Sequence, residues 1–502
     1  MSDQLAPVIL LIAVGVLVWD VVLAGWIASR REAPVAFTQL TGLCGLLVAP
    51  ALVVALATGT EAGSRTISGV AWLLPAIACA FVLQVLYAIV ARLVSTVVAL
   101  PILLYDLAVA AVAIGDYLVS QRGSAPIGLQ AAVAARDALI GMAVGRAALV
   151  SPFALLVPMV APAYQARWRL SAVVRASLVL SATAVTTVLV LEWPRGLAAV
   201  QSYEPALSVP MQSRPAGDFV IGMRLFPILD GPPPTRAAAA DLAMARDFAP
   251  EVVLVVIDED ATRSSALDSL TRALESLRAD SVLIAIALSV DGQPSALDDL
   301  DRLRALERVL TRVKPDVVFP ALSAPVPALL RSRLPSASWW RTTESRAAQV
   351  VARVRPRTVV AWAASRLDAT DSAVYAWAAT ASSPVRLIGA VAYPSFSGLP
   401  ALDARLRAFE RWHVRGRETG GATQPHWLVN VGGLAHAHGD AAQLAAIRHA
   451  LAWGSRRPWI GAVIVGEPAD YVGGLGLRAA NGRRRAAVKS IGAAAKAMRD
   501  VR

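Results

Sequence analysis

Long apolar runs dominate the first 193 residues of the chain, and the sequence after them is mixed. About 20 mostly apolar residues can cross a bilayer as a helix. Runs of this kind lie near residues 6–28, 37–59, 69–91, 94–116, 145–165 and 171–192. We therefore predict an α-helical membrane bundle of about six spans over 1–193, a linker over 194–216 and a separate domain over 217–502.

The fifth apolar run is the weakest, because Arg146, Pro152, Pro158 and Pro162 interrupt it. Proline breaks the helical hydrogen-bond ladder. A re-entrant or interfacial segment is the alternative to a span here. Residues 126–143 are a second candidate for a helix lying along the membrane surface.

Arginines in the short loops set the expected orientation. Arg30 and Arg31 follow the first run, Arg92 separates the third and fourth, and Arg167 and Arg169 separate the fifth and sixth. Because positive loops stay in the cytoplasm, six spans would place the C-terminal domain on the periplasmic side of the inner membrane. Losing one span would reverse this. The N-terminus lacks the basic region of a signal peptide, so we expect the first helix to remain as an anchor.

Charged residues occur inside the predicted spans, where they are costly and usually face a partner or a cavity. They are Asp20, Asp106 and Asp116, with Arg92 at a span edge. The spans carry few other polar residues. We therefore favour structural pairing of Asp20 or Asp106 with Arg92 over a transport path.

The part after residue 217 alternates short apolar runs with amphipathic helices. Nearly uninterrupted apolar strands are typical of parallel sheets buried on both faces. Eight such units predict a (β/α)8 TIM-barrel-like domain. An open doubly wound sheet is the alternative, although no Gly-x-Gly-x-x-Gly follows the first strand. The predicted strands are 219–225, 252–257, 282–288, 317–319, 358–362, 387–392, 427–431 and 460–465, and the predicted helices are 236–248, 263–278, 296–313, 340–354, 400–415 and 438–454.

Three stretches in the last third carry a family pattern. They are Val-Ala-Tyr-Pro-Ser at 391–395, Trp-Leu-Val-Asn-Val-Gly-Gly at 427–433 and Gly-Leu-Gly-Leu-Arg-Ala-Ala-Asn-Gly-Arg at 474–483. This pattern resembles the clan A-like glycoside hydrolases, with their sixth-strand Tyr-Pro, seventh-strand Trp-x-x-Glu-x-Gly and closing Gly-Leu and Asp-Gly-Arg-Pro stretches. The resemblance covers about 217–500 and implies a TIM barrel that acts on or binds carbohydrate.

Both catalytic positions depart from that family. The seventh-strand position of the nucleophile is occupied by Asn430, and the fourth-strand Asn-Glu-Pro is replaced by Leu-Ser-Ala-Pro, with Ala324 in the glutamate position. Retaining glycosidases need two carboxyl groups about 5 Å apart. An amide and a methyl group can neither attack an anomeric carbon nor protonate a leaving oxygen. The resemblance therefore implies a pseudoenzyme without the usual hydrolysis.

Carboxylates at other strand ends leave an active enzyme open. Asp258 and Glu259 follow the second predicted strand, and Glu467 follows the eighth. Strand ends at the carboxyl face of a barrel build its sites, so Glu467 with Asp258 or Glu259 could do acid/base work. The competing explanation for Asp258 and Glu259 is helix capping, which we favour.

Aromatic residues suggest where a sugar would bind, because apolar sugar faces stack on flat rings. Trp362, Tyr393, Phe396 and Trp427 are predicted near carboxyl ends of strands or in the following loops. Together with Asn430 they are our candidate substrate-binding residues. Ordinary packing of large rings is the alternative.

No cofactor is predicted, since the sequence has no phosphate loop, dinucleotide turn or cysteine cluster. His436-Ala-His438 with Asp440 could suggest a metal, but no third ligand has a recognisable spacing, so we expect a solvated loop and no metal. The net charge is +12, yet there are only three lysines and the arginines are scattered. We therefore expect no nucleic-acid partner.

The sequence thus predicts a membrane-anchored, glycosidase-like protein that binds or handles an extracytoplasmic polysaccharide, such as an exopolysaccharide. Its expected partners are the lipid bilayer, a possible polysaccharide and a possible membrane protein complex. One alternative is an active glycoside hydrolase with relocated carboxylates. The other is a barrel that serves as a scaffold docking onto another membrane protein complex.

Overall fold

The computed structural model describes residues 2–57, 72–122, 125–144 and 157–162, short pieces between 190 and 214, and most of 217–499. Within that last range it leaves out 264, 291–295, 324–334, 366, 368, 393–398, 434, 472–475 and 480–481. The described chain forms two compact units, one mainly from residues up to Glu204 and one mainly from Pro205 onward.

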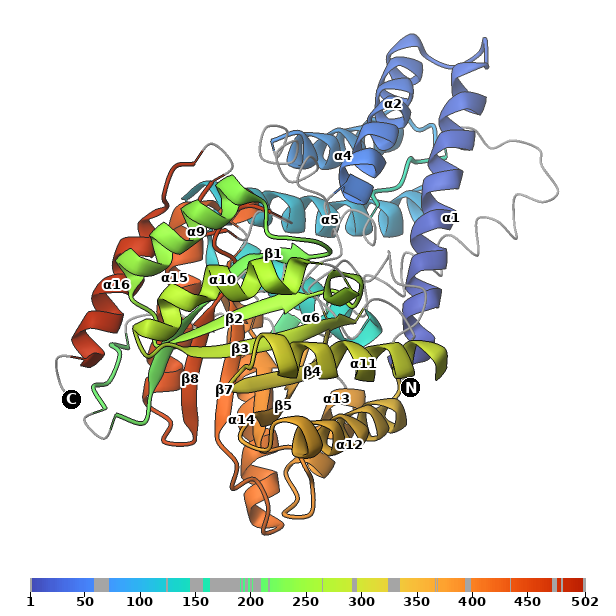
Figure 1. Cartoon of the computed structure of the whole chain (residues 1–502). Helices are drawn as coiled ribbons and strands as arrows, with labels where there is room; N and C mark the ends of the chain where they lie inside the picture. Colours follow the sequence, from blue (N-terminus) through green and yellow to red (C-terminus); the bar gives the residue numbers. More distant parts are fainter. Residues whose placement is uncertain are drawn as a thin grey trace. The chain divides into compact units, whose positions relative to one another are not determined.

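The second unit is a closed eight-stranded parallel barrel, in which each strand pairs with the next and β1 pairs with β8. The predicted (β/α)8 fold is confirmed. The strands form the inner layer, and helices cover it (Figure 1). They are β1 (Val220–Leu229), β2 (Val252–Ile257), β3 (Leu283–Val290), β4 (Val317–Ser323), β5 (Val359–Ala364), β6 (Leu387–Val391), β7 (His426–Val431) and β8 (Ile460–Val465).

The covering helices are amphipathic. In α10, for example, Leu267, Leu270, Leu274 and Leu277 form a buried stripe at helical spacing. The helices named from the sequence did not include α13, which is short and carries few polar residues, or the last helix, α16. The elements are α9 (Thr235–Phe248), the 3₁₀ helix η1 (Asp260–Arg263), α10 (Ala266–Ala279), α11 (Ala296–Arg312), α12 (Ala337–Val354), α13 (Ala369–Ala378), α14 (Leu399–Glu418), α15 (Ala435–Ser455) and α16 (Ala486–Arg499).

The register shifts near the carboxyl ends of β1, β3 and β7, and in β1 and β7 a residue at the shift has a positive φ. In β1 the shift lies between Leu225 and Leu229, and Phe226 has a φ of 64°. In β7 it lies between Leu428 and Val431, and Asn430 has a φ of 53°. Irregularities of this kind re-aim side chains beside functional sites. Both occur at the end of the barrel where such sites are built.

The first unit contains five described helices: α1 (Ser2–Ala28), α2 (Val35–Ala57), α4 (Leu73–Val90), α5 (Thr96–Arg122) and α6 (Ile127–Val144). Within the described residues, only Leu73–Val90 and Thr96–Leu118 are long and apolar enough to cross a membrane, and the apolar parts Gly15–Ala28 and Val35–Leu47 are shorter. The predicted count of about six is therefore reduced to two candidates. Most of the predicted fifth span and nearly all of the sixth lie outside the described residues.

The predicted pairing with Arg92 is wrong. Arg92 is exposed in the turn between α4 and α5, where its φ is 53°. The arginine that does pair is the buried Arg136 of α6, which donates two hydrogen bonds to Asp116 of α5. Asp20 and Asp106 instead accept hydrogen bonds from backbone N–H groups of residues 157–162, a non-helical stretch in the weak fifth run.

Candidate functional site

A buried ion pair joins the middle of β1 to the carboxyl end of β8. Arg224 of β1 and Glu467, two residues after β8, are 1% and 3% exposed. Arg224 Nη1 lies 3.1 Å from Glu467 Oε1. Neighbouring strands explain the contact, since Met223 pairs with Val465 in the β1–β8 ladder. In the part of the chain that the structure describes, Nε and Nη2 of Arg224 have no hydrogen-bond partner.

Asn430 lies on the next strand, as the fifth of the six residues of β7. It is 1% exposed, and its Oδ1 has no partner among the described residues. Gly466 N–H donates to Val431 O, which joins the end of β7 to the segment that carries Glu467. Arg224, Asn430 and Glu467 thus come from three adjacent strands of the barrel. We call these three residues the β7–β8–β1 cluster.

The carboxylates after β2 have a different arginine. Glu259 forms an ion pair with the buried Arg302 of α11, which also donates to Ser289 O at 3.1 Å. Asp258 accepts a hydrogen bond from the Glu259 N–H. Glu259 and Glu467 thus each form an ion pair with a different arginine, Arg302 and Arg224.

Glu344 is a buried carboxyl group that the sequence analysis did not identify. Glu344 of α12 is fully buried, and neither of its carboxyl oxygens has a hydrogen-bond partner within the described residues. Burial raises the pKa of Glu344 well above its usual value, and the nearby Arg302 opposes this only in part. The signal was present in the sequence, because Glu344 shares a helical stripe with Trp340, Ala347 and Val351.

The loop after Glu467 is held by a charged network. Asp470 and Arg485 share two hydrogen bonds of 2.8 Å, and Arg485 Nε donates to Asp440 at 3.0 Å. Gly476 fits tightly there, since a Cβ on it would lie 2.1 Å from the carbonyl carbon of Ala469. Gly476 of the 474–483 stretch therefore has a packing reason. Leu477 N–H donates to Glu467 O, so the network also fixes the backbone of the cluster.

A second polar network, centred on Asp241, connects α9 to the same loop. Asp241 is fully buried and accepts from Phe226 N–H at 3.1 Å, Tyr471 Oη at 2.9 Å and Arg478 Nη2 at 2.7 Å. Burial outweighs these bonds and raises the pKa of Asp241 to about 6. The hydrogen bond to Asp241 restrains Phe226, where β1 is irregular just beyond Arg224.

Of the four predicted aromatic residues, the structure describes Trp427 and Trp362. Trp427 is the second residue of β7, at its amino end, where a Cβ on Gly461 would lie 3.6 Å from the indole Nε1. The expectation that Trp427 lies near the carboxyl end is therefore wrong. Trp362 is fully buried within β5. Tyr393 and Phe396 lie outside the described residues, as does Ala324.

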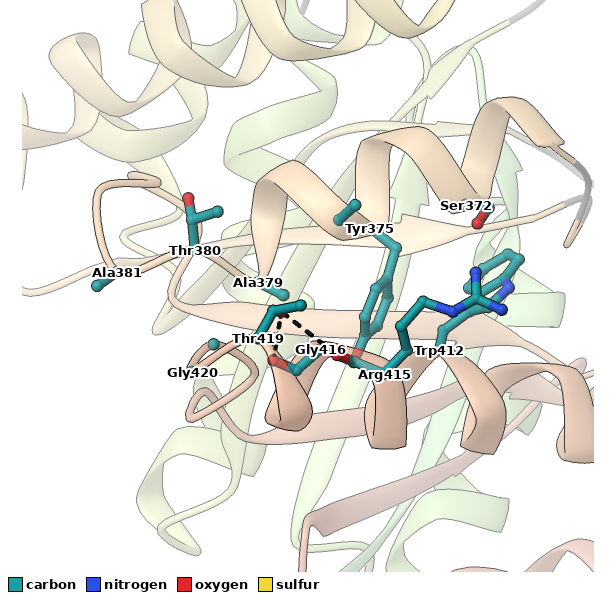
Figure 2. Close-up of a pocket in the computed structure, with 12 residues that line it drawn as sticks. Ser372, Tyr375, Ala379, Thr380, Ala381, Trp412, Arg415, Gly416, Thr419 and Gly420 are labelled. Carbon is teal, nitrogen blue, oxygen red and sulfur yellow. Dashed lines mark hydrogen bonds between the residues drawn. The ribbon is translucent and has the colours of Figure 1, made fainter.

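A pocket of about 230 Å³ opens between α13 and α14. Figure 2 shows Tyr375, Trp412 and Arg415 along it, with Thr419 and Gly420 at one end. The Tyr375 hydroxyl lies 2.9 Å from His426 Nε2, and His426 begins β7. This pocket therefore belongs to the amino end of β7, opposite to Asn430.

Two of the described histidines pack among aromatic rings. His426 packs edge-on against His413, which stacks on Trp459 with ring centroids 4.1 Å apart. Burial lowers the pKa of His426 to about 3. His436 and His438 belong to the first turn of α15, which corrects the expected loop. No group of three metal-ligating side chains occurs among the residues that the structure describes.

The barrel is similar to solved glycoside hydrolases. One is a β-glucuronidase from Bifidobacterium dentium, at 12% identity over 55% of this chain and 46% of that chain, with a TM-score of 0.40. Another is a psychrophilic glycoside hydrolase family 10 endo-β-1,4-xylanase, at 11% identity over 55% and 96%, with a TM-score of 0.38. A third is a family 128 endo-β-1,3-glucanase from Sorangium cellulosum, at 16% identity over 55% and 98%, with a TM-score of 0.36.

The chain spans less than half of that β-glucuronidase. No protein-family model matches the sequence, and no curated protein matches it significantly. At these identities the likeness concerns the fold alone. The class that the structure itself defines is a closed (β/α)8 barrel, preceded in the sequence by an apolar helical unit.

Proposed function

We propose that this protein is anchored in the inner membrane, and that its barrel binds a periplasmic polysaccharide without hydrolysing it by the two-glutamate route. The observation that carries the proposal is the β7–β8–β1 cluster. The end of β7 presents the amide of Asn430, and the carboxylate after β8 is engaged by Arg224.

The surface of the first unit supports the membrane placement. Large apolar side chains of its helices point outward, with Val90 and Val97 more than 80% exposed and Leu46 75% exposed. Contiguous exposed apolar surface marks a membrane or partner contact. A lipid environment would cover these side chains, as the length of α4 and α5 also suggests.

The cluster suits recognition of hydroxyl groups. Asn430 Oδ1 is a buried acceptor without a partner, and Arg224 has free N–H donors among the described residues. Buried polar groups left unpaired destabilise a protein unless a ligand or water bonds them. Sugar hydroxyls both donate and accept, so a sugar residue reaching these strand ends would satisfy both groups.

The test uses the full-length protein in lipid nanodiscs and a panel of β-glucans, xylans and glucuronide-containing polysaccharides. Binding is measured by calorimetry and turnover by release of reducing ends. We expect binding without turnover, weakened about tenfold in Asn430→Ala, a loss of about 1.4 kcal/mol for one hydrogen bond in a buried site. Glu275→Gln, on the exposed face of α10, is the matched control for Glu467→Gln.

Three results would count against the proposal. Turnover that disappears in Glu467→Gln and persists in Glu275→Gln would establish an active hydrolase with relocated carboxylates. Binding that is unchanged in Asn430→Ala would move the sugar site away from the cluster. An absence of binding across the panel would favour the scaffold function.

A further inference from the structure

The first unit surrounds a short extended segment with polar side chains from three helices. Residues 157–162 are not helical, and Val157, Met159, Val160 and Ala161 are buried. Met159 N–H donates to Asp106 Oδ1 of α5 at 2.7 Å. Val160 N–H, the next one along the chain, donates to Asp20 Oδ1 of α1 at 2.8 Å.

The same segment is held on both sides of these two bonds. Gln84 of α4 accepts from Ala161 N–H at 2.8 Å and donates to Ala161 O at 3.2 Å. Tyr105 Oη donates to Val157 O at 2.8 Å. At membrane depth, non-helical backbone is tolerated only where protein or a cavity covers it. These side chains provide that cover.

The two carboxyl groups keep unused oxygens. Asp20 and Asp106 are both 0% exposed, and the Oδ2 atom of each has no hydrogen-bond partner in the described chain. Their Oδ1 atoms bond consecutive N–H groups, so the carboxyl groups lie within about 9 Å of each other, given adjacent backbone nitrogens under about 4 Å apart. Two buried carboxyl groups this close can both stay ionised only with a positive charge beside them, and otherwise take up a proton.

No described basic side chain supplies that charge. Arg136 of α6 is bonded to Asp116, ten residues or about 15 Å along α5 from Asp106. Arg92 is exposed in the turn after α4. The other titratable groups facing the carboxyls are Tyr105 of α5 and Cys44 of α2, whose electrostatic interactions reach both Asp20 and Asp106.

A third oxygen comes from α2. Thr41 is 0% exposed, and its Oγ1 has no partner among the described residues. Thr41 precedes Cys44 by three residues, so both lie on one face of the helix. Because Cys44 is within electrostatic reach of Asp20 and Asp106, this face of α2 is turned towards the two carboxyl groups.

We propose that Asp20, Asp106 and Thr41, with carbonyl oxygens of residues 157–161, bind a sodium ion. Sodium takes oxygen ligands, and unwound backbone inside helix bundles coordinates it. A cation between the two carboxyl groups would bond their Oδ2 atoms and Thr41 Oγ1 together, none of which has a hydrogen-bond partner among the described residues.

The site ties three helices to the extended segment, so sodium binding would lock Asp20 of α1, Asp106 of α5 and Thr41 of α2 around it. This inference rests on the proposed membrane placement, and it is independent of polysaccharide binding. Resistance of the cellular protein to carbonate extraction tests the placement separately. A protein that is membrane-inserted but binds no sodium therefore refutes the site alone.

The experiment measures ²²Na⁺ binding and thermal unfolding of the full-length protein in nanodiscs, in NaCl or in choline chloride of equal ionic strength. We expect saturable binding of one sodium ion and a midpoint higher by roughly 5 °C at a hundred times Kd. Asp20→Asn and Asp106→Asn keep the Oδ1 acceptor for the backbone and should abolish both effects. The exposed Glu32→Gln is the control and should retain both.

Failure of ²²Na⁺ to bind the wild type would overturn the proposal. So would equal sodium stabilisation of the wild type and the two asparagine variants. A response confined to Mg²⁺ or Ca²⁺ would replace sodium with a divalent ion. Stabilisation by acid that disappears in Asp20→Asn, without sodium binding, would assign a proton to the carboxyls and also refute the sodium site.

Discussion

Glu467→Gln tests how much stability the protein loses when one partner of the buried Arg224–Glu467 ion pair is removed. Arg224 and Glu467 have side chains 1% and 4% exposed, with 3.1 Å between Nη1 and Oε1. Removing one partner of a buried pair leaves the other charge uncompensated, at a cost of about 3–5 kcal/mol. Glutamine keeps the shape and an acceptor, so we expect a loss of about 3 kcal/mol in the free energy of unfolding.

The double-mutant cycle separates this from a local packing defect. Arg224→Met should cost a similar amount, and Arg224→Met with Glu467→Gln should cost less than the sum by about 2 kcal/mol or more. Urea unfolding of the full-length protein in detergent, followed by tryptophan fluorescence, measures each variant. The more exposed pair Arg457–Glu410, at 2.8 Å, supplies the control, and Glu410→Gln should cost about 1 kcal/mol or less. A cost for Glu467→Gln no larger than this, or additive effects in the cycle, would refute the reasoning.

Three further outcomes are expected. His426 has a pKa of about 3 in the folded protein and roughly 6.5 in the unfolded chain, so the stability it contributes above pH 6.5 is lost as the pH falls towards 3. The free energy of unfolding should therefore be about 2 kcal/mol lower at pH 5 than at pH 7, and this difference should be smaller in His426→Gln. Gly476→Ala forces a Cβ against the backbone of Ala469 and should lower the free energy of unfolding, measured in urea, by about 1–3 kcal/mol. Gly231→Ala has open space around the new Cβ and should leave it unchanged. Asn430→Val places a β-branched residue at a φ of 53° and should cost about 1–2 kcal/mol by the same measurement.

The barrel could be predicted because its strands are buried on both faces and therefore read as apolar runs. The predicted bounds 252–257 and 460–465 coincide with β2 and β8. The prediction for β4 stopped at residue 319 although the strand continues to Ser323. Pro320 and the serine ended the apolar pattern there, while ladder pairing with β3 extends the strand.

The candidate site was predictable only in part, because run-based reasoning does not say which end of a strand a side chain occupies. Trp427 was expected at the mouth and lies at the opposite end, while Asn430, three residues later, lies at the carboxyl end. The partner of Glu467 was not found, since Arg224 is 243 residues away in sequence. An arginine in the middle of an otherwise apolar strand was the available signal, because a charge there needs a buried partner.

The helical unit shows why the expected ion pair with Arg92 failed. The sequence-based prediction paired a buried aspartate with a basic side chain. Backbone N–H groups can also be the partners of a buried aspartate where the chain is not helical. Pro158 and Pro162, which weakened the fifth apolar run, flank the three N–H groups that Asp106, Asp20 and Gln84 accept. Proline breaks the helical ladder and so frees neighbouring backbone donors. Prolines in a weak span and aspartates without a basic partner in neighbouring helices therefore form one pattern. The prolines free backbone N–H groups, and the aspartates accept hydrogen bonds from them.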